Sequence, residues 1–268
     1  MSGLERFITA KQTELAELER VVQSGSSALE PYGKMRPSFR AALTKDHRRG
    51  PLAVIAEFKK VSPSRGVICA SLEVEDVAGQ YAANGADAMS ILTEEKYFQG
   101  DMTYIPRVSH CLPDMPLLRK DFIFHPLQVA ATLASPASAL LLIVRLTPDV
   151  TVLRQLREQA EAGGVEAVVE VFDEADLRLA RESGAGIIQV NARDLASFHV
   201  DKEACLRLAR TCRPQEGEVW IAASGMGYRE DLEAAAEAGY HAALVGSALM
   251  EHGTPGLSLC RLLTRGEA

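Results

Sequence analysis

The chain has 268 residues and a formal net charge of -7, with 47% hydrophobic and 24% charged residues. These values are typical of a globular protein with a full hydrophobic core, and the length suits an α/β barrel, whose usual size is about 250 residues. An acidic balance without a long basic run argues against nucleic acid as the main partner.

The cysteine and histidine positions argue against a metal site. No two cysteines form a Cys-x-x-Cys pair, and the histidines show no metal-ligand spacing, so we expect neither a zinc site nor a disulfide framework. The N-terminus lacks the apolar core of a signal peptide. The longest apolar run, residues 137–144, is too short to span a bilayer. The sequence therefore predicts a cytoplasmic protein that uses no metal and no membrane.

Residues 1–48 read as an N-terminal helical extension. Apolar residues recur at helical spacing between charges and predict an amphipathic first helix: Leu4, Phe7, Ile8, Leu15, Leu18 and Val21. A short second helix is expected near 38–43. No strand pattern accompanies these helices, so this segment is an addition to the domain that follows. Whether it covers or plugs that domain is open at this point.

From Pro51 onward, short β-branched runs alternate with helical patterns. We expect strands near 53–58, 87–92, 115–119, 138–144, 166–171, 186–191, 218–223 and 242–246. Helices are expected near 73–84, 101–109, 126–134, 148–162, 173–183, 199–212, 228–238 and 255–264. Eight strand–helix units predict a (β/α)8 TIM barrel over residues 49–268, forming one structural domain with the extension. An open doubly wound sheet is the alternative, but the Gly-x-Gly-x-x-Gly turn typical of it is absent.

Polar residues gather where six of the predicted strands end. They are Glu57 and Lys59, Lys120, Glu170, Asn191 and Arg193, Ser224 and Gly225, and Gly246 and Ser247. Any one of them could have a structural role at the end of a strand. Together they match the rule that barrel chemistry lies at the carboxyl ends of the strands.

Two of these pairs favour a phosphate site. Barrels often bind phosphate in the loops after the seventh and eighth strands, where Ser224-Gly225 and Gly246-Ser247 would lie. Glycine lets backbone N–H groups approach an anion, and each hydroxyl adds a donor. Ser62, Arg65 and Arg193 are candidates to complete the site. Each dipeptide alone is an ordinary turn, so the expectation rests on their joint placement.

Two lysines and two glutamates, Lys59, Lys120, Glu57 and Glu170, are expected beside the phosphate site. A partly desolvated lysine among other cations can act as a general acid near neutral pH, and a shielded glutamate can accept the proton. The residues therefore indicate proton transfer on a phosphorylated small molecule, without assigning either lysine as the principal acid.

Four motifs, in order, make the chain resemble the indole-3-glycerol phosphate synthase family along almost its whole length. They are IAEFKKVSPSRG at 55–66, LTEEKYFQG at 92–100, LRKDFI at 118–123 and NARDL at 191–195. The resemblance implies a cytoplasmic carboxy-lyase of tryptophan biosynthesis. Such an enzyme closes the indole ring of 1-(2-carboxyphenylamino)-1-deoxyribulose 5-phosphate with loss of carbon dioxide and water. No cofactor is implied, and we expect a monomer or a weak oligomer.

The resemblance also implies residue roles. Lys120 would be the general acid, Lys59 would hold the substrate carboxylate, and Glu170 would serve the dehydration. Glu57, oriented by Asn191, would stabilise the cationic ring intermediate. Phosphate and carboxylate binding would involve Ser62, Arg193, Ser224, Gly225, Gly246 and Ser247. Phe98 and Phe122 would line the pocket for the aromatic ring, although both are equally compatible with core packing.

Two positions depart from the family pattern. Ala223 stands where the family usually has glutamate, and Gln189 stands where it tends to have glycine. Gln189 shares a strand face with Asn191, so we expect it to point into the barrel and to fill part of the space beside Ala223. The missing carboxylate leaves two alternatives to an active synthase: a related phosphosugar isomerase or lyase, or a catalytically weakened phosphosugar-binding barrel.

Overall fold

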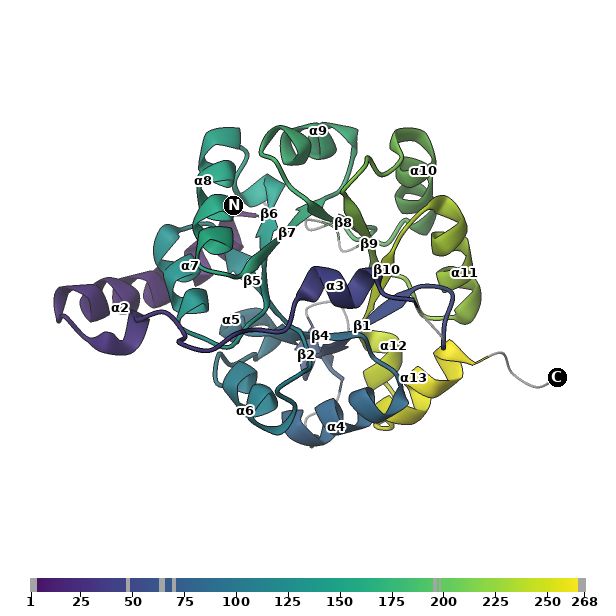
Figure 1. Cartoon of the computed structure of the whole chain (residues 1–268), viewed down its shortest axis with the longest axis horizontal. Coiled ribbons are helices and arrows are strands. Elements are labelled where there is room, and N and C mark those ends of the chain that lie inside the picture. Colours follow the sequence, from purple (N-terminus) through teal and green to yellow (C-terminus); the bar gives the residue numbers. More distant parts are fainter. Residues whose placement is uncertain are drawn as a thin grey trace.

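A computed structural model describes residues 4–46, 49–62, 66–68, 71–194, 197 and 199–264. Its centre is a closed parallel barrel with the strand order β1-β10-β9-β8-β7-β6-β5-β4 (Figure 1). The strands are β1 (Ala53–Phe58), β4 (Ala88–Leu92), β5 (Leu117–Ile123), β6 (Ala139–Ile143), β7 (Glu166–Val171), β8 (Ile187–Asn191), β9 (Val219–Ala223) and β10 (Ala242–Val245). The predicted (β/α)8 barrel is confirmed.

Most residues of the barrel strands are apolar on both faces, since each strand is covered on both sides. Along β1, Val54 and Ala56 face the surrounding helices, whereas Ile55 faces the barrel interior. The same alternation divides the core into a layer between strands and helices and a second cluster inside the barrel. Side chains at the ends of this inner cluster therefore face the two mouths of the barrel.

Helices surround the strands in chain order (Figure 1). They are α4 (Val74–Asn84), α6 (Tyr104–Cys111), α7 (Pro126–Leu133), α8 (Val150–Ala162), α9 (Glu174–Glu182), α10 (Lys202–Cys212), α11 (Arg229–Ala238) and α13 (Pro255–Leu263). Asp173 accepts a hydrogen bond from the N–H of Asp176 and starts α9, as side-chain N-caps do. Gly85, with φ of 98°, ends α4 in the left-handed conformation that glycine adopts readily.

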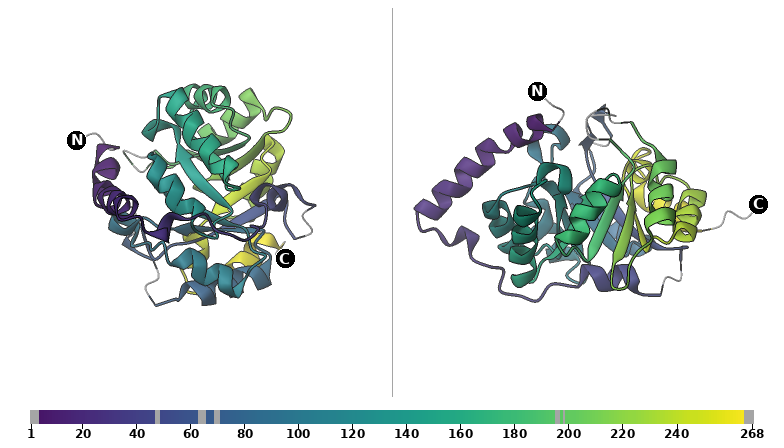
Figure 2. Two further views of the ribbon diagram at one scale, coloured as in Figure 1. Left: turned by 60° about the vertical axis from the view of Figure 1, so that its left-hand side comes forward. Right: turned by 90° about the horizontal axis from the view of Figure 1, so that it is seen from above.

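The extension reaches both mouths of the barrel. It contains α1 (Glu5–Ala10), α2 (Gln12–Gln23), a short 3-10 turn (Ser27–Leu29) and α3 (Phe39–Thr44). Helix α3 lies across the amino-terminal mouth (Figure 1), where Phe39 and Leu43 join the inner core. The carboxylate of Glu166, the first residue of β7, accepts the N–H groups of Phe39 and Arg40. In Figure 2, α1 and α2 form an arm along the side of the barrel that carries α7.

Most bounds differ from the sequence expectation by a few residues, and two of the differences bear on the pocket. The amphipathic pattern at the N-terminus predicts one helix, but Lys11 separates α1 from α2. The third barrel strand was expected to end at 119, before the charges of Lys120 and Asp121. It continues to Ile123 because buried Arg119 and Asp121 pair with each other and with α2 or Lys11. Lys120 therefore lies within β5 rather than beyond it.

Small elements absent from the expectation lie at the carboxyl ends of the strands. The hairpin β2 (Val61–Ser62) and β3 (Gly66–Val67) follows β1, and the single turn α5 (Glu95–Phe98) follows β4. The short helix α12 (Ser247–Met250) follows β10. The carboxylate of Glu94 accepts three N–H groups at the start of α5, which gives so short a helix a defined beginning.

Within the described ranges, no helix is long and apolar enough to cross a membrane. The same residues contain no group of three or more His, Cys, Asp or Glu placed to hold a metal ion.

Candidate active site

A cavity of about 770 Å³ opens at the carboxyl ends of the barrel strands. Of the site residues expected from the sequence, it is lined by Glu57, Lys59, Phe98, Lys120, Phe122, Glu170, Asn191, Arg193, Ser224, Gly225, Gly246 and Ser247. Ser62 is not among the described lining residues; it is buried in β2. Arg65 falls outside the described residues. One pocket therefore unites side chains from strands that are far apart in the sequence.

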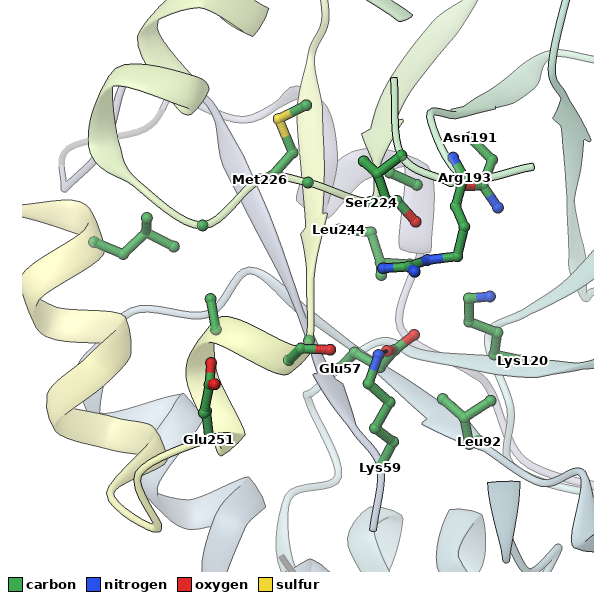
Figure 3. A pocket seen from close by; sticks show the side chains of 18 of the residues that line it. Glu57, Lys59, Leu92, Lys120, Asn191, Arg193, Ser224, Met226, Leu244 and Glu251 are labelled. Carbon is green, nitrogen blue, oxygen red and sulfur yellow. Dashed lines mark hydrogen bonds and ion pairs between the residues drawn. The ribbon is translucent and has the colours of Figure 1, made fainter. Parts of the chain in front are cut away.

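Glu57 and Lys59 share a face at the end of β1, as the strand alternation predicts. Their side chains form an ion pair with Oε1 and Nζ 2.6 Å apart. Burial alone would raise the pKa of Glu57, but the positive charges of Lys59, Lys120 and Arg193 hold it below its usual value. Glu57 is therefore a carboxylate at neutral pH in a positively charged surrounding (Figure 3).

Gly246 is required by Glu57. A Cβ at position 246 would lie 2.3 Å from Oε1 of Glu57 and 3.0 Å from its Cδ. Real side chains do not approach so closely, so the glycine makes room for the carboxylate where β10 meets α12. This requirement adds to the expected role of Gly246 in admitting an anion to the backbone.

Lys120 is directed into the pocket between two buried charges of β5. Figure 3 shows it facing the same open space as Lys59 and Arg193. Its neighbour Asp121 accepts the Thr93 hydroxyl at 2.6 Å and lies 2.9 Å from Nζ of Lys11. Burial would raise the pKa of Asp121, but the positive charges of Arg119 and Lys11 and the Thr93 hydrogen bond keep it below its usual value. Buried ion pairs therefore fasten β5 on either side of Lys120.

Glu170 projects from β7 and is hydrogen-bonded by Gln189 of β8. The two residues are neighbours in the parallel register, and Nε2 of Gln189 donates to Oε2 of Glu170 at 2.5 Å. Gln189 points inward as expected. The contact of its amide is with Glu170, however, on the opposite side of β8 from Ala223.

The turns after β8 and β9 form the polar rim. Oδ1 of Asn191 accepts the backbone N–H of Arg193 at 3.0 Å, which places the arginine side chain over the pocket (Figure 3). Ser224 and Gly225 both have positive φ, 67° and 79°. A Cβ at Gly225 would lie 2.6 Å from Cγ of Lys202, so this turn also needs glycine. The structure shows no direct hydrogen bond by which Asn191 orients Glu57 in the described part of the chain.

Apart from Lys120 and Asp121 of β5, the wall formed by β4, β5 and β6 is apolar. It includes Phe122, Leu92, Leu141 and Ile143, and α5 adds Phe98. Phe7 of the extension completes this wall, with its ring stacked on Phe122 at a centroid distance of 4.0 Å. In the strand order, β5 lies across the barrel from β9. The aromatic wall therefore faces the turns that carry Ser224 and Gly225.

Sequence reasoning missed Phe7 as a site residue. Its helical spacing predicts that it lies on the apolar face of α1, and Phe7 is indeed buried there. The signal that places it in the pocket is the stacking on Phe122, which involves residues more than a hundred positions apart.

Comparison with known proteins identifies the family. The model of the family described as Indole-3-glycerol phosphate synthase matches residues 4–261. The chain belongs to this family. The indole-3-glycerol phosphate synthase of Carboxydothermus hydrogenoformans is 40% identical over 226 residues, 84% of each chain. That of Desulfotalea psychrophila is 38% identical over 263 residues, 97% of each chain. The resemblance inferred from the four motifs is thereby confirmed.

Solved structures show the same fold at low identity. A 3-hexulose-6-phosphate synthase superposes with a TM-score of 0.61 over 79% of this chain and 98% of that chain, at 16% identity. Ala223 occupies the position where the sequence resemblance leads us to expect glutamate. Ala223 lines the pocket beside Leu244 and leaves that part of the wall apolar.

Proposed function

We propose that the chain is an indole-3-glycerol phosphate synthase. It would convert 1-(2-carboxyphenylamino)-1-deoxyribulose 5-phosphate to indole-3-glycerol phosphate, carbon dioxide and water in tryptophan biosynthesis. The observation that carries this proposal is the arrangement of the pocket. Lys59, Lys120 and Arg193 line it together with Glu57 and Glu170, between an aromatic wall and two glycine-containing turns. A substrate with an aromatic acid at one end and a phosphate at the other matches both ends of this cavity.

The phosphate would bind at the rim of β9 and β10. Ser224 and Ser247 line the cavity beside Gly225 and Gly246, and Arg193 supplies a positive charge. The aromatic ring would lie between Phe98, Phe122 and Phe7, with its carboxylate near Lys59. In this orientation the sugar carbonyl lies in the middle of the pocket, close to Lys120.

Lys120 would act as the general acid in ring closure. A ring carbon attacks the sugar carbonyl, the new carbon–carbon bond forms, and the carbonyl oxygen takes a proton from the Lys120 ammonium. The ring then carries positive charge, which the ionised Glu57 stabilises. Cleavage of the carboxylate bond returns its electron pair to the ring and releases carbon dioxide.

Dehydration would follow in the same pocket. The new hydroxyl leaves as water with a proton from a lysine, and a proton is removed from the adjacent carbon. Glu170, held on β7, would accept that proton or act as the partner of the acid. Lys59 and Lys120 are both placed to donate, and pH–rate profiles of single substitutions would separate them.

The test is turnover of the carboxyphenylamino substrate, followed by the absorbance of the indole product. Wild type should turn over, and Lys120→Ala should lower kcat by roughly 100-fold or more, the usual worth of a general acid. Ala223→Glu should fold and bind the substrate. Substrate binding without turnover in wild type, with activity only in Ala223→Glu, would instead identify a weakened synthase. Silence in all three proteins would point to another phosphosugar.

A further inference from the structure

Gln189 and Glu170 form a polar pair in the interior of the barrel, and the packing of apolar side chains does not explain it. Gln189 is fully buried and does not line the cavity. Its Nε2 donates to Oε2 of Glu170 at 2.5 Å, whereas its Oε1 has no hydrogen-bond partner in the described part of the chain. An unpaired buried carbonyl costs folding free energy. A methionine would fill similar space without that cost, so packing alone does not account for glutamine here.

The contact is aimed at a pocket residue. Glu170 lines the cavity, and the register places Gln189 beside it on β8. A hydrogen bond donated to a carboxylate is charge-assisted and restricts the side chain to one rotamer. The orphaned Oε1 is the cost of presenting the amide N–H to Glu170.

We propose that Gln189 is a positioning residue that holds Glu170 on the β7 wall as an oriented carboxylate. The inference rests on the proposed role of Glu170 in the dehydration. Gln189 does not touch the pocket and acts only through Glu170.

Other charged groups also line the pocket and would shape its pH dependence. They are Glu57 of β1 with Lys59, Lys120 and Asp121 of β5, Arg193 after β8, and Lys202, Arg229, Glu230, Glu251, His252 and Arg261 of the later segments. Only Gln189 and Glu170 differ in the variants that follow, so the contribution of the remaining groups is constant between them.

Two substitutions of similar size give different pH signatures. Gln189→Met removes the donor that fixes the Glu170 side chain. We expect kcat to fall roughly tenfold, the worth of a hydrogen bond to a charged group, by a similar factor across the pH range. Gln189→Glu can donate from its protonated form at low pH. Its deficit should grow as pH rises, because two adjacent carboxylates then repel.

Val190→Ala is the matched control for disturbance of β8. Val190 is equally buried but faces the outer layer of the core. It should lower the urea midpoint more than Gln189→Met does, because it leaves a cavity whereas Gln189→Met removes an orphaned carbonyl. Its kcat and pH profile should match those of wild type.

The decisive comparison includes Glu170→Gln. Low kcat in Glu170→Gln, with a deficit that grows with pH only in Gln189→Glu and little change in KM in either Gln189 variant, supports the positioning role. Wild-type kcat and pH profile in Gln189→Met would overturn it, as would equal losses at every pH in both variants. Wild-type turnover in Glu170→Gln would overturn the role of Glu170 and the inference with it, while leaving the synthase activity itself established.

Discussion

The charge of Glu57 depends directly on its neighbours. It is buried at the end of β1, and its ion pair with Lys59 shares the pocket with Lys120 and Arg193. A buried carboxylate without such partners would neutralise itself by taking up a proton. The ionised form that the proposed mechanism requires of Glu57 is therefore maintained by residues on three different strands or loops.

The charge on Glu57 links stability to pH. Because its pKa in the folded protein lies below the ordinary value of 4.5, the unfolded chain binds more protons in the interval between the two values. The contribution of Glu57 is thus fully present above pH 4.5 and is lost as pH falls through the folded-state pKa. Lys59→Met removes the nearest cation and should raise the pKa of Glu57.

We expect the urea midpoint of wild type to rise between about pH 3 and pH 5. In Lys59→Met this rise should be smaller. The double variant Glu57→Gln/Lys59→Met serves as the control, because it lacks the Glu57 carboxylate whose protonation is being followed. Parallel pH curves for wild type and Lys59→Met would contradict the assignment of the shift to Lys59.

At the scale of elements, β5 shows how buried charge can extend a strand. Arg119 donates to Thr93, Thr132 and the carbonyl of Gln128, and pairs with Glu14 of α2. Asp121 lies between Arg119 and Lys11. This network fastens the extension to the strand that carries Lys120, so the arm formed by α1 and α2 also fixes one wall of the pocket.

Removing one partner of this network should be costly. Lys11→Met leaves the buried Asp121 with less compensation, and we expect about 3 kcal/mol lower free energy of unfolding by urea titration. The exposed pair Arg178–Glu174 on α9 is the control, since Arg178→Ala should cost about 0.5 kcal/mol or less. A loss in Lys11→Met as small as that of the control would show that the network does not fasten the extension.

At the scale of the whole molecule, the two mouths of the barrel divide stability from function. Helix α3 closes the amino-terminal mouth with Phe39, and α1 brings Phe7 to the pocket at the other mouth. In barrels, the former face serves stability and the latter carries the chemistry. One extension of the chain thus serves both ends.

This division predicts different consequences for two phenylalanines of equal burial. Phe39→Ala should lower the free energy of unfolding by about 3–5 kcal/mol and leave KM close to wild type. Phe7→Ala should lower stability as well, and it should also raise KM several-fold because the aromatic wall loses a ring. Urea unfolding and steady-state kinetics on both variants check this. An unchanged KM in Phe7→Ala would remove Phe7 from the substrate pocket.

The sequence alone determined the barrel and most of its pocket, because both follow from local patterns. Alternation along each strand sets which side chains face inward, and parallel strands bring residues such as Glu57, Lys120 and Glu170 to one mouth. Four motifs then sufficed to recognise the family.

Only the tertiary structure decided the contacts between distant residues. Phe7 lines the pocket because its ring stacks on Phe122, which lies near the middle of the chain. Arg119 and Asp121 remain within β5 because α2 and Lys11 pair with them. Gln189 faces inward by alternation, but its choice of Glu170 over the space beside Ala223 depends on which neighbouring strand offers an acceptor. The local sequence pattern determines the direction in which a side chain points. Its contact partner depends on how segments that are distant in the sequence pack together.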